Sequence, residues 1–417
     1  MSTFARSTLS MTAVLAAVSF GMAPDVASAV DFDGYMRVGP GATSRNSSRA
    51  CYNLTGLSGA GHYRLGNECN FYGEFGLSHI GTVDGVSYKA KVMFNQNNNP
   101  GTDVGKSSTS FEQMYVEAKG FDISPDTNFW IGKRFYGRAD VHIVDTFFVR
   151  MDGVGAGADS IALAGGKLGV AYFSSDSGTG LGDTGTGAST NPGIRLNADL
   201  TDVPVNPGGK LRVTATLTKG NFDNATDHTG TNGFGLSLQH NQALSGLGGG
   251  NTMWLQYAQG SAGLDANFGT MIAPSGVKKF RIVESVTWQV GPLGGQALAL
   301  YGRHGQDDVA QTPKFSEFSI GGRASYAVTK NFKLLAELGH MEKRPDGQDT
   351  QKLTKFTFAP ALATGPAFFN RPELRLYVTT ARWNNAANAA AGLAGLTGLS
   401  NGRTRGTSYG AQAEIWF

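Results

Sequence analysis

A period-two alternation of apolar and polar residues constrains this chain more than any other feature. Residues 30–38 read Val-Asp-Phe-Asp-Gly-Tyr-Met-Arg-Val, and residues 409–417 alternate in the same way. Successive residues of a β-strand point to opposite sides, so each segment has one apolar and one polar face. The pattern recurs between the ends, for example over 65–77 and 317–328. Repeated segments of this kind are typical of a transmembrane antiparallel β-barrel, an all-β fold.

Two kinds of connection separate the predicted strands. Tight turns are predicted where Pro, Gly, Asn or Asp cluster, at 124–126, 206–209, 291–294 and 329–331. Long polar stretches predict surface loops at 95–110, 174–192 and 384–407. Short turns at one rim and long loops at the other are typical of outer-membrane barrels.

Composition excludes a helical membrane protein but leaves a soluble alternative open. No stretch after residue 29 approaches the roughly 20 apolar residues that a membrane-spanning helix needs. A hydrophobic share of 40% fits a soluble β-sandwich as well as a barrel, because a wall that is apolar outside and polar inside averages to the same value. Phe417, on the apolar face of the last predicted strand, favours the barrel, since a terminal Phe is the usual assembly signal of outer-membrane barrels.

The first 29 residues read as an export signal. Arg6 precedes an apolar run, and Ala27-Ser28-Ala29 supplies small residues for cleavage. A membrane-anchor helix is the rival interpretation, but the run is too short for a span. We therefore expect a signal peptide at 1–29 and one barrel domain at 30–417.

Two cysteines and a small net charge limit the remaining chemistry. In an exported chain, Cys51 and Cys69 predict a loop disulfide, and a metal pair or reactive thiol lacks companion ligands. The net charge of +3 comes from basic residues spread along the chain rather than bunched, which gives nucleic-acid binding little support.

Several motifs carry a family resemblance along most of residues 30–417. They are Val-Asp-Phe-x-Gly-Tyr-x-Arg at 30–37, Tyr-Arg-Leu-Gly-Asn-Glu-Cys at 63–69, Gly-Lys-Arg-Phe-Tyr at 132–136 with Gly-Ala-Gly at 155–157, Asn-Pro-Gly-Gly at 206–209, Asn-Arg-Pro at 370–372 and Gly-Ala-Gln-Ala-Glu-Ile-Trp-Phe at 410–417. Together they resemble the maltoporin family of sugar-specific outer-membrane porins. The segment 132–157 resembles that family's fourth strand and third loop.

The resemblance implies an eighteen-stranded barrel that assembles as a homotrimer in outer-membrane lipid, with the third loop folded into the pore. It implies a path for maltose and maltodextrins and neither a cofactor nor a metal. Carried over by position, an aromatic line for sugar rings comprises Tyr35, Tyr72, Phe147, Phe369 and Trp416. A flanking polar track comprises Arg37, Arg64, Glu74, Arg138 and Asp145.

Strand parity agrees with this assignment where it can be tested. Tyr35 and Arg37 fall on the polar face of the first strand, and Trp416 falls on the polar face of the last. Barrels also carry aromatic girdles at their rims, but girdle residues face lipid. The charged residues have an alternative role as structural ion pairs.

Four positions depart from the family pattern. Phe147 replaces a tyrosine at the constriction, residues 95–110 hold no Trp, Glu112 replaces a track arginine, and Leu236 replaces a slide aromatic. These differences leave the preferred sugar open, with a general diffusion pore as one alternative. A positive-to-negative change at 112 favours cations.

Other function classes receive less support. A barrel enzyme needs a nucleophile, a base and an acid at its rim, and although His142 lies near Asp140 and Asp145 in sequence, no nucleophile motif accompanies them. An adhesive or phage-receptor role for the long loops is compatible with a porin and does not explain aromatic residues in a lumen.

Overall fold

The protein was analysed as a computed structural model that describes residues 30–98, 108–175, 192–220, 230–306, 313–392, 395–396 and 402–417, apart from 46, 48, 55 and 58–61. The expected signal peptide at 1–29 lies outside the described residues. So do residues 99–107 of the Trp-free stretch and most of the predicted loop at 174–192.

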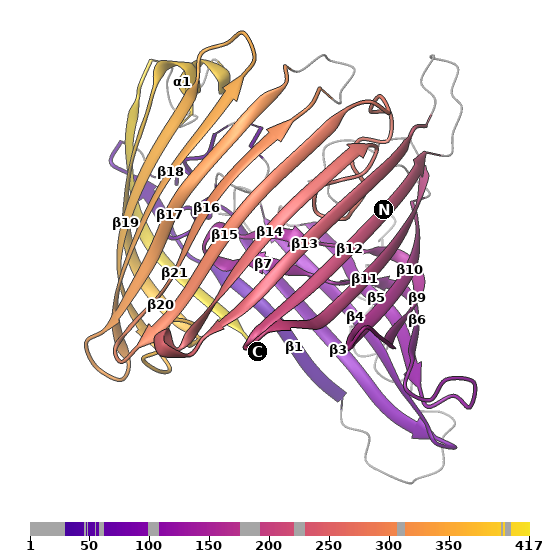
Figure 1. Cartoon of the computed structure of the whole chain (residues 1–417). Coiled ribbons are helices and arrows are strands. Elements are labelled where there is room, and N and C mark those ends of the chain that lie inside the picture. Colours follow the sequence, from indigo (N-terminus) through magenta and orange to yellow (C-terminus); the bar gives the residue numbers. More distant parts are fainter. Residues whose placement is uncertain are drawn as a thin grey trace, which may run out of the picture.

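The described residues form a closed antiparallel β-barrel with strongly tilted strands (Figure 1). Its strands are β1 (Val30–Val38), β2 (Gly41–Thr43), β3 (Phe71–Val83), β4 (Val86–Asn98), β5 (Ser108–Lys119), β6 (Asn128–Arg134), β9 (Gly153–Leu163), β10 (Gly166–Ser175), β11 (Gly193–Asn206), β12 (Gly209–Gly220), β13 (Asn232–Leu244), β14 (Gly249–Gly260), β15 (Lys278–Val290), β16 (Leu293–His304), β17 (Phe315–Ala327), β18 (Phe332–Pro345), β19 (Gln351–Ala363), β20 (Glu373–Trp383) and β21 (Arg405–Trp416).

These elements make up one 19-stranded sheet. β1 and β2 both pair with β21 and are two parts of one barrel strand, so the wall has the expected eighteen strands. The other side of β1 pairs with β3, which closes the barrel. β6, which carries Gly132, is therefore the fifth strand of the wall and not the fourth, as the resemblance had suggested.

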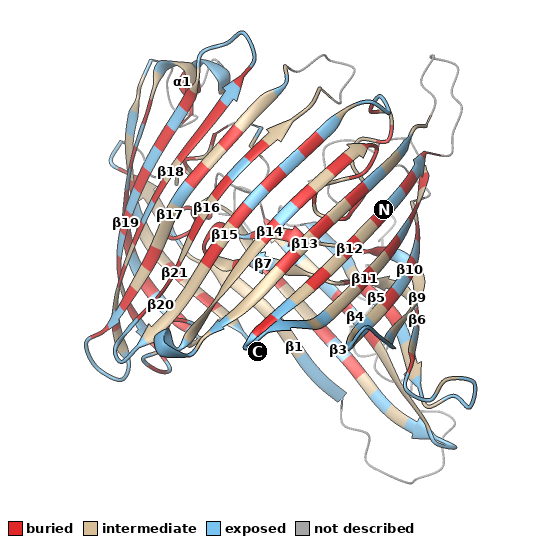
Figure 2. Ribbon diagram, viewed as in Figure 1, coloured by how far each residue is buried: buried red, intermediate tan, exposed pale blue. Residues whose placement is uncertain are grey.

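Alternation in the sequence becomes alternation of faces in the wall (Figure 2). Along β20, every second residue is buried and those between are exposed. Arg375 and Thr379 point inward, whereas Leu376 and Val378 form part of the outer apolar surface. The predicted faces of 317–328 are confirmed, with Arg323 inside.

The two rims differ as predicted. Short connections at 84–85, 164–165, 207–208, 291–292 and 328–331 lie at the rim where β21 ends (Figure 1). The opposite rim carries the long connections and the short helix α1 (Asn385–Ala390). Among the described residues, no helix is long and apolar enough to cross a membrane.

The segment 135–152, between β6 and β9, folds into the lumen as expected for the third loop. It contains β7 (Ala139–Val141), the 3-10 turn η3 (His142–Val144) and β8 (Thr146–Val149). The backbone N–H of Ile143 donates to Gln296 Oε1 at 3.2 Å, and Arg195 donates to the carbonyl of Met151 at 2.6 Å. Ile143 and Phe148 are fully buried, and burying an apolar side chain of this size contributes roughly 1.5–3 kcal/mol.

A second inward segment, 62–70, corrects one expectation. The alternation read from residue 65 does not belong to a strand until Phe71, where β3 begins. Leu65, which the alternation over 65–77 places on the apolar face of a strand, is instead fully buried inside the barrel, and its backbone N–H donates to Glu337 Oε1 at 2.9 Å. Cys51 and Cys69 form a disulfide at the base of this segment. Closing a loop of this length contributes roughly 3 kcal/mol.

A third inward segment comes from the connection between β14 and β15. The carbonyl of Asp265 accepts a hydrogen bond from the backbone of Arg150 at 2.7 Å, and the carbonyl of Ala266 accepts one from Asn197 at 3.0 Å. Three inward segments therefore narrow the lumen.

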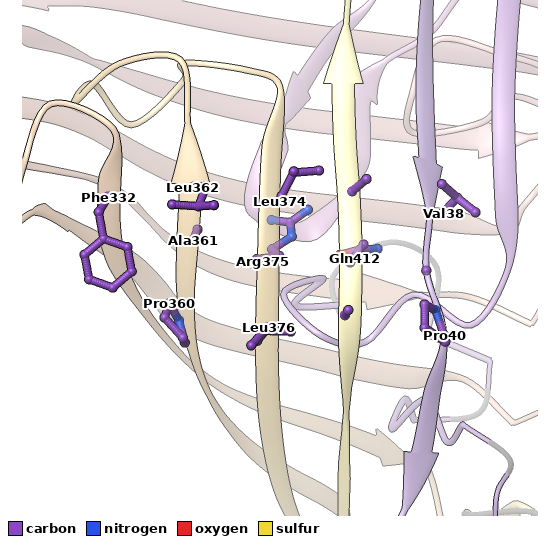
Figure 3. A pocket seen from close by; sticks show the side chains of 13 residues that line it. Val38, Pro40, Phe332, Pro360, Ala361, Leu362, Leu374, Arg375, Leu376 and Gln412 are labelled. Atoms are coloured by element: carbon purple, nitrogen blue, oxygen red, sulfur yellow. The ribbon is translucent and has the colours of Figure 1, made fainter.

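An apolar groove lies outside the lumen, on the outer face of β18 to β21 and β1 (Figure 3). Its volume is about 570 Å³, and Leu362, Leu374 and Leu376 border it. The wall is hollow here because Ala411 and Ala413 have short side chains and Gly39-Pro40 interrupts the strand formed by β1 and β2.

Candidate functional site

Register at the barrel closure places the candidate residues in two rows on the lumen face. In one row Trp416 lies opposite Tyr35, which lies opposite Glu74. In the next row Glu414 lies opposite Arg37, which lies opposite Tyr72. β21, β1 and β3 therefore present aromatic rings beside charged groups along one wall.

Four rings of the predicted aromatic line follow one another around this wall. The ring centroids of Tyr72 and Tyr35 are 6.3 Å apart, and Trp416 neighbours Tyr35 across β1 and β21. His142 joins Trp416 to Phe369, with centroid distances of 5.6 Å and 5.8 Å. Phe369 lies in the connection between β19 and β20, so the line descends from β3 to the rim with short turns. Trp416 and Phe369 remain 38% and 43% exposed, which leaves ring surface open.

Arginine side chains lie over these rings. The guanidinium carbons of Arg37 and Arg64 lie 5.3 Å and 5.8 Å from the centroids of Tyr72 and Tyr35, and that of Arg371 lies 4.6 Å from Trp416. A cation over a ring is attracted by the negative quadrupole of the ring face. Each contact orients its ring.

The polar-track arginines are held by carboxylates. Arg37 pairs with Glu68 at 2.9 Å and with Asp145 at 3.0 Å, and this second pair ties the inward segment 135–152 to β1. Arg64 pairs with Glu68 at 2.7 Å and Glu414 at 3.0 Å. The Arg64 side chain is only 5% exposed, whereas that of Asp145 is 35% exposed. Asp145 is therefore the more accessible hydrogen-bonding group.

Charge states in the inward segments follow from these contacts. Burial would raise the pKa of the Asp145 carboxyl, but Arg64 and Arg37 outweigh it and hold that pKa below its usual range. Burial lowers the pKa of His142 well below its usual value, and the neighbouring Arg64 and Arg371 act in the same direction against an opposing effect of Glu414. Asp145 is thus an anion and His142 a neutral ring near neutral pH.

Comparison with known proteins identifies the family. Residues 30–417 match the profile described as LamB porin. The chain belongs to the LamB porin family. A maltoporin from Hahella chejuensis (strain KCTC 2396) is 29% identical over 406 residues, covering 94% of this chain and 93% of that protein.

Solved structures share the fold at low sequence identity. OccAB1 of Acinetobacter baumannii superposes with a TM-score of 0.51 at 10% identity, covering 93% of this chain and 96% of that one. OpdL of Pseudomonas aeruginosa gives 0.50 at 12% identity, covering 94% and 99%. Family and fold together make the chain a sugar-type porin of the bacterial outer membrane.

The other predicted residues of this LamB porin lie near the constriction. Arg138 donates to Asp152 Oδ2 from Nε at 2.8 Å, and its guanidinium lies 4.7 Å from the ring centroid of Phe147. Tyr72 donates its hydroxyl proton to Glu74 at 2.5 Å. Phe147 has no ring contact with the four wall residues in the part of the chain that the structure describes. It lies two residues from Asp145, on the segment that narrows the pore.

Two of the positions that depart from the family pattern lie on opposite faces of the barrel wall. Glu112 lies in the lumen, where Asn95 donates to its carboxylate and Ser110 donates at 3.4 Å. Leu236 lies opposite Ala215 and Tyr257, among the outward residues of β12 to β14. The expectation that Leu236 replaces an aromatic residue of the sugar path is therefore wrong, because its side chain faces lipid.

The porin also holds residues that the sequence analysis did not assign to the site. Glu68 pairs with Arg37 and Arg64, and Glu414 pairs with Arg64. Arg371 pairs with Glu414 and lies over the ring of Trp416. Strand parity could have assigned Glu414 to the site, because Glu414 shares the lumen face of its strand with Trp416. No such pattern indicated Glu68, because its position depends on how a loop folds into the barrel.

Proposed function

We propose that this porin conducts sugars of the maltose and maltodextrin type by facilitated diffusion along the line Tyr72, Tyr35, Trp416 and Phe369. A pyranose has an apolar C–H face that packs on an aromatic ring and a rim of hydroxyls that needs hydrogen-bond partners. The single observation that carries the proposal is the run of lumen-facing rings on adjacent strands, beside Glu74, Asp145 and Arg138.

Conduction needs sites that bind and also release. Equivalent weak sites in succession satisfy both requirements, because a sugar passes from one ring to the next without crossing a deep minimum. The track arginines are engaged with carboxylates, so sugar hydroxyls compete for groups that already have partners. This arrangement favours rapid exchange over tight binding.

The departures at 147 and 112 support a modified selectivity. Phe147 offers no hydroxyl at the constriction, and Glu112 places a negative charge at the wall of β5. We propose weaker retention of long oligosaccharides and a preference for cations. The homotrimer and a phage-receptor role for the long loops remain predictions from the resemblance.

Single-channel current of the chain starting at Val30, reconstituted in a planar bilayer, tests the proposal. Maltose, maltotriose, sucrose and glucose are titrated in turn. Saturable block by maltose and maltotriose is the expected result. Open channels that none of the sugars blocks would contradict the sugar path and favour a general diffusion pore, and block by sucrose alone would reassign the substrate.

A further inference from the structure

A row of basic side chains crosses the outer face of the barrel near the rim with long connections. Backbone register places His340 of β18 opposite Thr354 of β19, Thr354 opposite Arg382 of β20, and Arg382 opposite Arg405 of β21. Arg344 and Lys352 lie just above, with side chains 56% and 52% exposed. Four cationic residues thus occupy one patch spanning four neighbouring strands.

These side chains face outward. Arg382 shares strand parity with Leu376 and Val378, which are 63% and 46% exposed, and Arg405 shares it with Tyr409. The patch therefore lies directly above the apolar outer band, on the side of the barrel away from the lumen and from the sugar path.

Charge in this patch is unbalanced. Among the described residues, Glu342 is the one carboxylate that forms ion pairs with members of the patch, and it contacts Arg344, Lys352 and His340. Asp346 and Asp349 lie in the turn between β18 and β19, where Asp346 pairs with Arg303. Arg382 and Arg405 lie directly opposite each other, and neither has an ion-pair or hydrogen-bond partner in the described part of the chain. Like charges directly opposite on a sheet are destabilising. An anion placed between them would remove that repulsion.

The position of the patch selects the kind of anion. Long connections mark the extracellular rim of an outer-membrane barrel, so the patch lies at the headgroup level of the outer leaflet. Arginine binds phosphate through two parallel N–H groups, which makes a phosphate strongly preferred over a neutral headgroup. The apolar groove of Figure 3 lies toward the opposite rim, beside Phe332 and Leu374 at the other ends of these strands, and takes no part in this site.

We propose that Arg344, Lys352, Arg382 and Arg405 form a binding site for the phosphate groups of lipid A, the phosphorylated glycolipid of the outer leaflet. The two unpaired arginines hold one phosphate between them. Lys352 and Arg344 exchange contacts with Glu342 for contacts with the second.

Binding of purified lipid A to the chain starting at Val30, in detergent with EDTA, tests the site. Native mass spectrometry compares the double variant Arg382→Gln/Arg405→Gln with a matched control, Lys219→Gln/Lys278→Gln. Both control lysines are exposed and outward near the same rim, on β12 and β15, and are far from the patch in strand order. The double variant should bind bis-phosphorylated lipid A roughly 30-fold more weakly, and the control should bind as the parent does.

Two further measurements test whether the phosphate groups are what the patch binds. Dephosphorylated lipid A should bind the parent chain as weakly as it binds the double variant. Equal binding of both lipid forms, or equal loss in the control, overturns the proposal. A lipid-independent change in oligomeric state of the double variant would identify a second copy of the chain as the partner instead. Unchanged sugar-free conductance verifies folding, and Arg405→Gln alone replaces the double variant if that fails to fold.

Discussion

Tyr35 and Trp416 lie directly opposite each other across the β1–β21 pair that closes the barrel. The chain joins residues 381 positions apart into neighbouring rings on one lumen wall, and the hydroxyl of Tyr35 donates to Glu414 at 3.1 Å. Closure of the wall and continuity of the aromatic line therefore depend on the same strand register. A slip of either strand by one residue would turn the ring on that strand toward lipid and interrupt the line.

Replacing Trp416 by Ala should weaken sugar block of the channel current roughly tenfold, because stacking on a large ring contributes about 0.5–1.5 kcal/mol beyond the area that it buries. Tyr409→Ala is the matched control, since Tyr409 is on the same strand with its ring outward and 49% exposed. The half-blocking concentration of maltotriose measures both. An equal loss in the two variants would point to a general effect on the barrel and not to the aromatic line.

Restoring the hydroxyl at the constriction should tighten sugar binding. Phe147→Tyr adds one hydrogen-bond donor and acceptor at the segment that narrows the pore, and a net hydrogen bond contributes about 0.5–1.5 kcal/mol, or roughly 2- to 10-fold in affinity. Phe129→Tyr adds the same group to the outer face of β6, and no change is expected there. If Phe147→Tyr leaves maltotriose affinity unchanged, the ring does not contact sugar.

Strand faces were predictable because they depend on local alternation. The inward course of a loop depends on distant partners, so no local pattern predicted it, and that of 135–152 was implied only by the family resemblance. In β20 the period of two determines which residues meet the lumen. Leu65 continues the sequence alternation of β3 but lies inside the barrel, where its backbone N–H donates to the carboxylate of Glu337, which is 272 residues away. Leu236 shows a different error, since the resemblance assigned it to the sugar path, whereas its position opposite Ala215 and Tyr257 places it on the outer face.

The residues of the candidate site differ in the same way, because some lie on strands and others on inward segments. Tyr35, Arg37 and Trp416 could be placed from parity alone, since each belongs to a strand. Arg64 and Asp145 could be named only from the resemblance, because both lie on segments whose inward course is determined by contacts with remote wall residues. Their carboxylate and arginine partners follow from that course and not from any local pattern.

The sign of the charge at Glu112 should determine ion preference. Glu112 faces the lumen with Asn95 and Ser110 as hydrogen-bond partners, so its charge acts directly on passing ions. The cation-to-anion permeability ratio, taken from the reversal potential in a KCl gradient, should fall from the parent to Glu112→Gln and further in Glu112→Arg. The same ratio in all three would show that ions are selected elsewhere in the pore.

Sugar affinity should show no step near pH 6.5, because the groups that surround Arg37 and Arg64 in the inward segments keep their charge on both sides of that pH. Arg64 and Arg37 keep the pKa of Asp145 below its usual range, and the same two arginines lower the pKa of Glu68 although its burial opposes them, so both carboxylates stay ionised. Histidine with an ordinary pKa of about 6.5 would take up a proton on acidification. Burial lowers the pKa of His142 well below that value and that of His62 to about 4, so both rings stay neutral.

Half-blocking concentrations of maltotriose at pH 8, 6.5 and 5 measure this, with His142→Gln as the neutral control. The parent and the variant should give profiles of the same shape, because an amide and a neutral imidazole both carry no charge throughout. A step near pH 6.5 in the parent that disappears in His142→Gln would mean that the His142 ring gains a proton beside Arg64 and Arg371. That result would contradict the desolvation expected for a ring in contact with Trp416 and Phe369.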